Sequence, residues 1–292
     1  MCDESKLSEW AESTISRRQF GALSGAAALA ACASGESEGQ AQPLPGLTER
    51  GLNFPTADGT LDGFLVQPDT GNHPAVILWP DIAGIREAKR NIARKLAQAG
   101  YAVLVVNPYY RDVTGEQFAD FAAFIADGGF QKVGPWRAKL TPEAIMRDTT
   151  SIVDWLDRQE GVDQAKGIGT QGYCMGGPFT IWSAAAVPSR LKAAASFHGG
   201  GLVRPDNPMS PHALLGKVEA SLLIAVAKDD DAKAPTDKTT FAAAAKAANV
   251  PATVEVYPGN HGWMVSDSPA YDATASARGE ADLKALYAQA LA

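Results

Sequence analysis

A cysteine flanked by glycines is the residue of this sequence best placed to act as a nucleophile. Cys174 stands in Gly172-Tyr173-Cys174-Met175-Gly176-Gly177, between a short apolar stretch and a helical pattern. The spacing G-x-C-x-G is that of a nucleophile elbow, a sharp turn where small residues on both sides let a strand and a helix approach. A buried cysteine in a glycine-rich turn could also be purely structural, because cysteine is among the most buried residue types.

Candidate partners for this cysteine lie further along the chain. The acidic run Asp229-Asp230-Asp231 follows one apolar strand pattern, and His261 follows the next. A histidine can take up the thiol proton, and a carboxylate can hold the imidazole in the useful tautomer. Only His198 and His261 among the four histidines stand at strand ends, and only His261 follows the acids. Counting from the preceding strand favours Asp230 as the acid, whereas counting back from the following helix favours Asp231.

The attack of a thiolate on a carbonyl also requires donors for the negatively charged oxygen that forms. Backbone N–H groups after the nucleophile and after an early strand can serve, and these belong to Met175 and Ile82. Each candidate also has a structural interpretation: His261 could be a turn residue, the aspartates a solvated helix start, and Asp81 a helix cap. A metal site built from these aspartates and nearby histidines fits no known ligand spacing, so we predict no metal.

The elements that must position these residues alternate between strands and helices. We expect strands at 50–55, 61–67, 75–79, 101–106, 167–171, 191–197, 222–227 and 252–257, and helices at 86–99, 141–158, 178–187, 235–249 and 277–291. This alternation predicts a single doubly wound α/β domain, in which the candidate residues gather at the carboxyl ends of the strands. The irregular, aromatic-bearing segment 115–140 is predicted to be a lid.

The composition narrows the classes of partner. The 292 residues carry a net charge of −7, a pI near 5.2 and 46% hydrophobic residues, as in a globular protein. No basic stripe is present, which argues against nucleic acid or an anionic membrane surface as a partner. We expect a small-molecule substrate and a monomer.

The N-terminus differs from the rest of the chain. Ser16-Arg17-Arg18-Gln19-Phe20 precedes a short apolar run and resembles a Tat-type export signal. Leu29-Ala30-Ala31-Cys32 looks like a lipobox, which would place a lipid anchor on Cys32, whereas cleavage around the same site could release a soluble protein. We therefore expect a signal peptide over 1–33, a flexible tether over 34–46, and a periplasmic or envelope-anchored domain over 47–292. That domain contains one cysteine.

Three motifs together resemble the dienelactone hydrolase family. They are the elbow at 172–177, Tyr257-Pro258-Gly259-Asn260-His261-Gly262 and Asn107-Pro108-Tyr109-Tyr110-Arg111, and the likeness runs from about residue 47 to the C-terminus. The resemblance implies an α/β-hydrolase fold with about eight mostly parallel strands and helices on both faces. It also implies a cofactor-free hydrolase of small esters or lactones that uses Cys174, Asp230 and His261 through an acyl-thioester intermediate.

The sequence departs from the family pattern near the site. Asp81 stands where the family usually has a glutamate that hydrogen-bonds the resting thiol, which implies a thiol partner one methylene shorter. Val265 replaces an arginine that binds the substrate carboxylate in dienelactone-cleaving members, so we expect a more apolar pocket. Tyr110, Arg111 and Trp263 are predicted to line it. A non-catalytic envelope binding protein on the same fold is the alternative, whereas a serine-type hydrolase is disfavoured because the elbow carries no serine.

Overall fold

The computed structural model describes residues 44–292. The predicted export signal, the lipobox and residues 34–43 of the predicted tether lie outside the described residues. Across residues 44–292, no helix combines the length and the apolar character that crossing a membrane requires.

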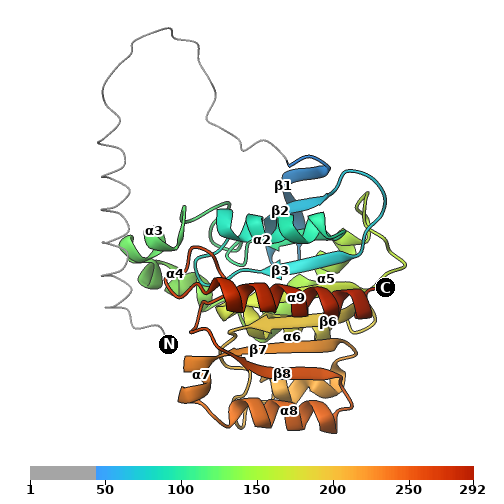
Figure 1. Ribbon diagram of the computed structural model, residues 1–292. Helices are drawn as coiled ribbons and strands as arrows, with labels where there is room; N and C mark the ends of the chain where they lie inside the picture. Colours follow the sequence, from blue (N-terminus) through green and yellow to red (C-terminus); the bar gives the residue numbers. More distant parts are fainter. Residues whose placement is uncertain (1–43) are drawn as a thin grey trace.

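Eight strands of this described part form one sheet, in the order β1-β2-β4-β3-β5-β6-β7-β8 (Figure 1). They are β1 (Leu47–Thr56), β2 (Gly59–Pro68), β3 (Ala75–Trp79), β4 (Ala102–Val106), β5 (Ile168–Tyr173), β6 (Leu191–Phe197), β7 (Ser221–Ala227) and β8 (Ala252–Tyr257). β2 pairs antiparallel with β1 and with β4, and the pairs from β4 through β8 are parallel. The predicted mostly parallel sheet of about eight strands is confirmed.

Helices cover both faces of the sheet (Figure 1). One face carries α2 (Glu87–Gln98) and α9 (Ala273–Ala290), and the other carries α5 (Pro142–Leu156), α6 (Gly177–Ala186) and α8 (Asp237–Ala247). Successive residues of a strand point to opposite faces, so Val76 packs into the core under α2 and α9 while Ile77 packs into the core under α5 and α6. Burial on both faces explains why β3 is apolar throughout.

Side chains at helix starts account for where several helices begin. The Thr141 side chain accepts a hydrogen bond from the Ala144 N–H, and Pro142 occupies the first turn of α5, as the sequence predicted. Asp272 caps α9 in the same way by accepting from the Ala275 N–H. That cap places the start of α9 four residues before the predicted position.

Two segments next to the strand ends are more regular than their sequences indicate. Residues 115–140 contain α3 (Phe121–Ala126) and α4 (Gly129–Arg137), whose aromatic side chains pack on one another. The acidic run lies within α7 (Lys228–Lys233), which begins directly after β7. Two short 3₁₀ segments, η1 (Cys174–Gly176) and η2 (Pro211–Lys217), complete the described elements.

Candidate active site

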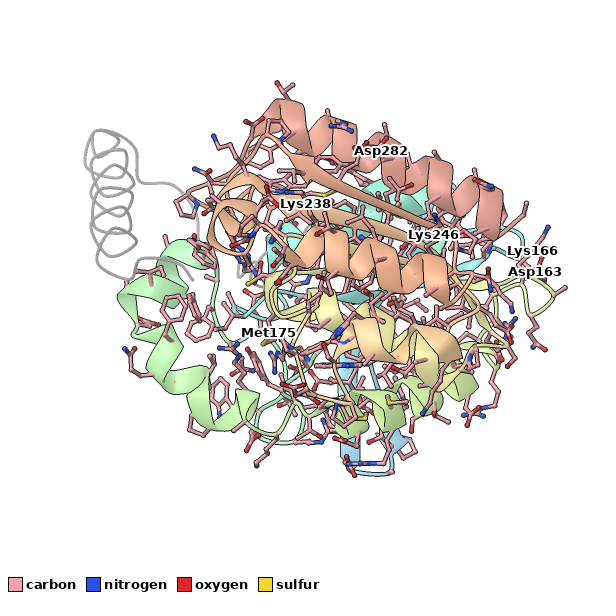
Figure 2. All side chains as sticks on the ribbon, turned by 90° about the horizontal axis from the view of Figure 1, so that it is seen from below. Asp163, Lys166, Met175, Lys238, Lys246 and Asp282 are labelled. Atoms are coloured by element: carbon pink, nitrogen blue, oxygen red, sulfur yellow. The ribbon has the colours of Figure 1, made fainter. Side chains whose placement is uncertain are left out.

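Cys174 occupies a strained turn at the end of β5. Its φ is +51°, a left-handed conformation that side-chain-bearing residues rarely adopt, and its side chain is half-buried. The neighbouring Met175 lies at the end of the molecule that carries α3 and α4, opposite Asp163 and Lys166 (Figure 2). The chain therefore presents the thiol at the carboxyl end of the sheet, where an elbow nucleophile is expected.

The glycines around Cys174 are required by close backbone contacts. A Cβ at Gly172 would collide with the carbonyl oxygen of Gly176, and one at Gly176 would lie 2.6 Å from the Pro80 carbonyl oxygen. A Cβ at Gly177 would lie 2.5 Å from the Gly199 Cα. The elbow pattern in the sequence thus reflects a turn in which strand, helix and neighbouring loops touch through backbone atoms.

The histidine predicted as the base lies between the thiol and an aspartate. His261 Nδ1 is 2.5 Å from Asp230 Oδ2, and the imidazole interacts with the Cys174 thiol closely enough to lower the pKa of that thiol. The His261 N–H donates to Asp229 Oδ1 at 2.7 Å, which holds the loop against α7. Asp231 instead pairs with Lys238, with 2.5 Å between Oδ1 and Nζ. The sequence did not decide between Asp230 and Asp231 as the acid, and the structure gives the two aspartates different partners.

The charges of these groups favour a thiolate next to an imidazolium. Burial raises the pKa of the Cys174 thiol, but the charge and hydrogen bond of His261 and the Met175 N–H together hold that pKa below its ordinary value. Burial lowers the pKa of His261, yet Cys174 and Asp230 outweigh this effect and raise the pKa to about 11. Both shifts therefore favour the charged pair of thiolate and imidazolium.

The His198 ring lies against His261, and the Trp263 ring lies against His198 in turn. The His198 ring centroid is 5.1 Å from that of His261, and neither ring nitrogen of His198 has a hydrogen-bond partner among residues 44–292. Burial, followed by the charge of His261, holds the pKa of His198 well below its usual value, so this ring is neutral. Trp263 was predicted to line the substrate pocket, but it is 0% exposed and stacks on Tyr257. Trp263 therefore supports the histidine loop from within the core.

Asp81, the predicted partner of the thiol, pairs with two buried cations. Its Oδ1 lies 2.7 Å from Arg86 Nη1, and its Oδ2 lies 2.7 Å from Lys89 Nζ. Both cations are fully buried, and Arg86 also pairs with Asp267. Arg86 and Lys89 hold the pKa of the Asp81 carboxyl well below its usual range despite its burial. The carboxylate is thus engaged by two cations from the α2 region instead of by Cys174.

The predicted oxyanion donors lie on the two loops next to the elbow. The Met175 N–H acts to lower the pKa of the Cys174 thiol. In the loop after β3, the Ala83 N–H donates to Asp81 Oδ1 and the Gly84 N–H to the Asp81 carbonyl, whereas the Ile82 N–H has no partner within residues 44–292. One of the two predicted donors is therefore free to receive a ligand oxygen.

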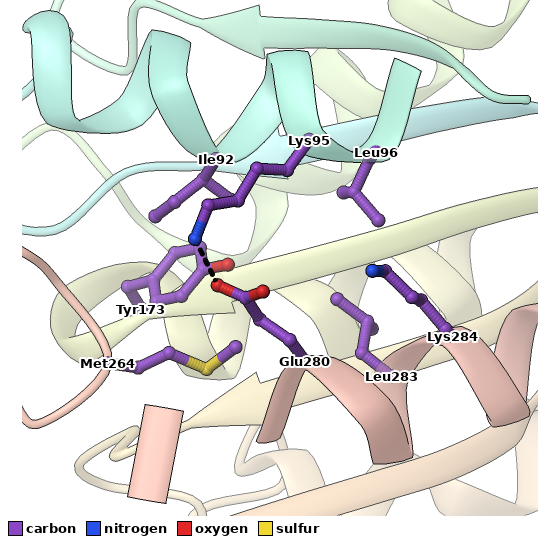
Figure 3. A pocket seen from close by; sticks show the side chains of 8 residues that line it. All are labelled: Ile92, Lys95, Leu96, Tyr173, Met264, Glu280, Leu283 and Lys284. Carbon is purple, nitrogen blue, oxygen red and sulfur yellow. Dashed lines mark hydrogen bonds and ion pairs between the residues drawn. The ribbon is translucent and has the colours of Figure 1, made fainter. Parts of the chain in front are cut away.

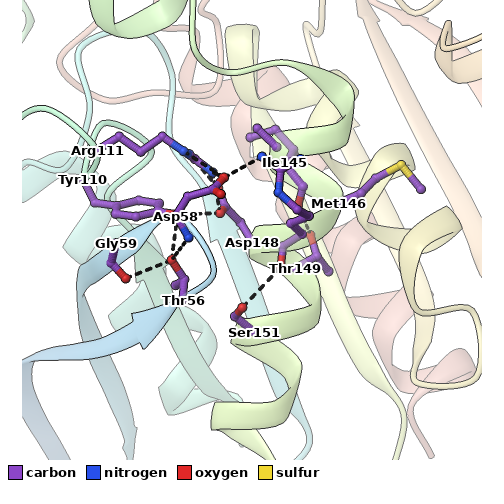
Figure 4. A network of polar contacts seen from close by, with 12 residues as sticks. Thr56, Asp58, Gly59, Tyr110, Arg111, Ile145, Met146, Asp148, Thr149 and Ser151 are labelled. Atoms are coloured by element: carbon purple, nitrogen blue, oxygen red, sulfur yellow. Dashed lines mark hydrogen bonds and ion pairs between the residues drawn. The ribbon is translucent and has the colours of Figure 1, made fainter.

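Tyr110 and Arg111 belong to a polar network instead of the predicted pocket (Figure 4). The Tyr110 hydroxyl donates to Asp148 Oδ1 at 2.6 Å, and Arg111 Nη2 lies 2.7 Å from both Asp148 Oδ1 and Asp58 Oδ2. These bonds join the β1–β2 turn to α5. The prediction is corrected because both polar side chains are already engaged by buried or half-buried carboxylates, which a sequence pattern does not reveal.

Cys174 does not line the crevice between α2 and α9. A small crevice lies between α2 and α9, where Ile92, Leu96 and Leu283 face one another and Lys95 Nζ lies 2.6 Å from Glu280 Oε1 (Figure 3). Tyr173 separates this crevice from Cys174, which packs against the core on the other face of the sheet. Within the described chain, no group of three or more His, Cys, Asp or Glu side chains is arranged to hold a metal ion.

The fold and the elbow together define the class of protein: this is an α/β-hydrolase, with the candidate nucleophile between β5 and α6. The family model described as "Dienelactone hydrolase family" matches residues 61–291. The chain therefore belongs to the dienelactone hydrolase family, and it is a hydrolase that acts on ester bonds of small molecules.

Individual relatives agree with this assignment. A protein of Escherichia coli (strain K12) named "Putative carboxymethylenebutenolidase" is 26% identical over 232 residues, which are 78% of this chain and 82% of that protein. The crystal structure "Putative Dienelactone Hydrolase" from Klebsiella pneumoniae superposes with a TM-score of 0.70 at 24% identity, covering 83% of this chain and 99% of that one. A dienelactone hydrolase-like promiscuous phosphotriesterase from metagenomic libraries has a TM-score of 0.66 at 23% identity and covers 85% and 100% of the two chains. These structures share the fold.

Proposed function

We propose that this protein hydrolyses a small ester or lactone by covalent catalysis, with Cys174 as nucleophile, His261 as acid and base, and Asp230 as the residue that orients His261. One observation carries the proposal: His261 lies 2.5 Å from Asp230 through Nδ1, and the same imidazole is close enough to Cys174 that each group shifts the pKa of the other toward its charged form. Because Nδ1 is engaged by the carboxylate, Nε2 is the nitrogen that exchanges a proton at the thiol.

The first half of the reaction acylates the cysteine. The Cys174 thiolate attacks the carbonyl carbon, and the carbonyl oxygen becomes an oxyanion within reach of the N–H groups of Met175 and Ile82. The C–O bond to the alcohol then breaks, and the His261 imidazolium gives its Nε2 proton to the departing alkoxide. The product is a thioester on Cys174 and a neutral imidazole; in a lactone, the new hydroxyl stays attached to the acyl group.

The second half restores the enzyme with water. His261 Nε2 removes a proton from a water molecule, which attacks the thioester carbonyl and forms a second oxyanion. Collapse of this intermediate breaks the C–S bond, releases the carboxylic acid and returns the thiolate beside an imidazolium. Asp230 keeps its charge throughout and stabilises the imidazolium each time it forms.

The surroundings support an uncharged substrate group near the histidine loop. Val265, four residues after His261, is buried among apolar side chains, so no cation stands at that position. Two cations at the start of α2, Arg86 and Lys89, are engaged by Asp81. We therefore propose substrates without a carboxylate at this end of the pocket.

The experiment is hydrolysis of p-nitrophenyl acetate by the full chain, with Cys174→Ala and Cys174→Ser as variants. We expect turnover in the wild type, its loss in Cys174→Ala, and an acyl adduct of acetyl mass on Cys174 after rapid acid quenching. Prior treatment with iodoacetamide should abolish turnover in step with alkylation of Cys174. Turnover that survives in Cys174→Ala, or a wild type that neither turns over nor labels, would refute the proposal.

A further inference from the structure

A single buried phenol contacts both loops that carry the oxyanion donors named above. Tyr109 follows β4, is 1% exposed, and packs its ring against Trp136 of α4 at 5.6 Å between ring centroids. Its hydroxyl donates to the Ile82 carbonyl oxygen at 2.8 Å and lies 3.4 Å from Met175 Sδ. These contacts place the Tyr109 hydroxyl between the loop after β3 and the elbow.

The contact at Ile82 fixes a whole peptide unit. The Ile82 carbonyl and the Ala83 N–H belong to the same planar peptide group. Tyr109 holds its oxygen, and Asp81 Oδ1 accepts from its nitrogen at 3.0 Å. A planar group that is held at both ends cannot rotate freely. The Ile82 N–H belongs to the preceding Asp81–Ile82 peptide, whose carbonyl accepts from the Gly84 N–H at 3.0 Å, so the peptide planes on both sides of Ile82 are restricted.

The phenol remains a donor under all working conditions. Burial, reinforced by the negative charges of Asp81 and Cys174, raises the pKa of Tyr109 well above its ordinary value. The Tyr109 hydroxyl therefore keeps its proton while the Cys174 thiolate forms nearby. A phenylalanine would fill most of the same volume but would leave the Ile82 carbonyl buried without this donor.

We propose that Tyr109 is a positioning residue that aligns the Ile82 N–H for the oxyanion by holding the Ile82–Ala83 peptide. The role rests on the function proposed above, because it presumes a tetrahedral oxyanion at this place. Tyr109 itself does not contact the reacting atoms. Tyr109 affects acylation and deacylation equally, because both steps form an oxyanion that is bound by the same N–H donors.

The test compares Tyr109→Phe with the matched control Tyr110→Phe in the full chain. Tyr110 is the adjacent buried tyrosine, and its hydroxyl bonds Asp148 away from the thiol. For p-nitrophenyl acetate, we expect Y109F to lower kcat and kcat/KM together by roughly 3- to 10-fold with KM unchanged. The control should keep its kcat. The rate of Cys174 alkylation by iodoacetamide should be unchanged in Y109F, because alkylation at a saturated carbon forms no oxyanion.

Several outcomes would overturn the proposal. If Y109F keeps the wild-type kcat, the Tyr109 hydroxyl has no positioning role. If Y109F loses Cys174 alkylation in parallel with turnover, the substitution has damaged the site in general and the specific role is refuted. If the space left by the hydroxyl prevents folding, 4-fluorophenylalanine at position 109 fills that space, lacks a donor, and should give the same kcat loss. Failure of the proposed function would be seen in other measurements: the wild type would not hydrolyse p-nitrophenyl acetate, or Cys174→Ala would still hydrolyse it.

Discussion

Replacing the aspartate that pairs with His261, while leaving its neighbour intact, is the sharpest test of the candidate site. Asp230→Asn keeps the size of the side chain but removes the charge that faces His261 Nδ1 at 2.5 Å. The amide can also present its NH₂ group to Nδ1, which would favour the wrong tautomer of the imidazole. Turnover should therefore fall although the fold is retained.

The size of the effect follows from the bond that is lost. A hydrogen bond to a charged group contributes about 1.5–3 kcal/mol, which corresponds to a fall in kcat/KM of roughly 10- to 150-fold. The matched control is Asp231→Asn, which removes a half-exposed ion pair with Lys238. Such pairs contribute only about 0–1 kcal/mol to stability, so kcat/KM should stay within about twofold of wild type.

The assay is steady-state hydrolysis of p-nitrophenyl acetate, accompanied by the pH dependence of Cys174 alkylation. In Asp230→Asn, the imidazolium loses a stabilising charge, so the pKa of His261 should fall and alkylation of Cys174 should require higher pH. Equal losses in Asp230→Asn and Asp231→Asn would contradict the assignment of the orienting acid. A larger loss in Asp231→Asn would reverse it.

Three further predictions concern the thiol, the elbow and the buried charges. Because His261 holds the pKa of Cys174 below its ordinary value, alkylation should reach half its maximum rate below pH 8.5, roughly the pKa of a free cysteine, and His261→Ala should shift that midpoint upward. Gly177→Ala places a Cβ 2.5 Å from the Gly199 Cα and should destabilise the fold by about 1–3 kcal/mol, measured as a lower midpoint of urea unfolding. Asp81→Ala leaves Arg86 and Lys89 without their shared partner and should cost about 3–5 kcal/mol in the same measurement.

The strands and the sharp turn at Cys174 could be predicted because their patterns have local physical causes. β3, β6 and β8 have the bounds expected from the sequence, since strands between turns read as compact apolar or alternating runs. The glycines around Cys174 were informative because backbone contacts at the elbow exclude a Cβ. The order of cysteine, acids and histidine then placed the candidate groups at the same edge of the sheet.

Side-chain partners could not be predicted in the same way, because they depend on rotations that sequence spacing does not specify. Asp230 and Asp231 are separated by about 100° around α7, which directs one to His261 and the other to Lys238. Tyr109 and Tyr110 are also neighbours, yet their hydroxyls reach the Ile82 carbonyl and Asp148 respectively. A helical pattern of residues 86–99 likewise gives no sign that two of its cations are fully buried.

Arg86 and Lys89 explain why the nearby Asp81 carboxylate does not prevent Cys174 from ionising. The negative charge of Asp81 acts to raise the pKa of Cys174, and so opposes the thiolate. Arg86 and Lys89 neutralise that charge, and Asp267 on the far side of Arg86 balances the second cation. Burial lowers the pKa of Lys89 to about 8, so this balance of two cations and two anions holds at neutral pH and weakens above it. The two cations therefore limit the repulsion that Asp81 adds to burial, and His261 still holds the pKa of Cys174 below its ordinary value.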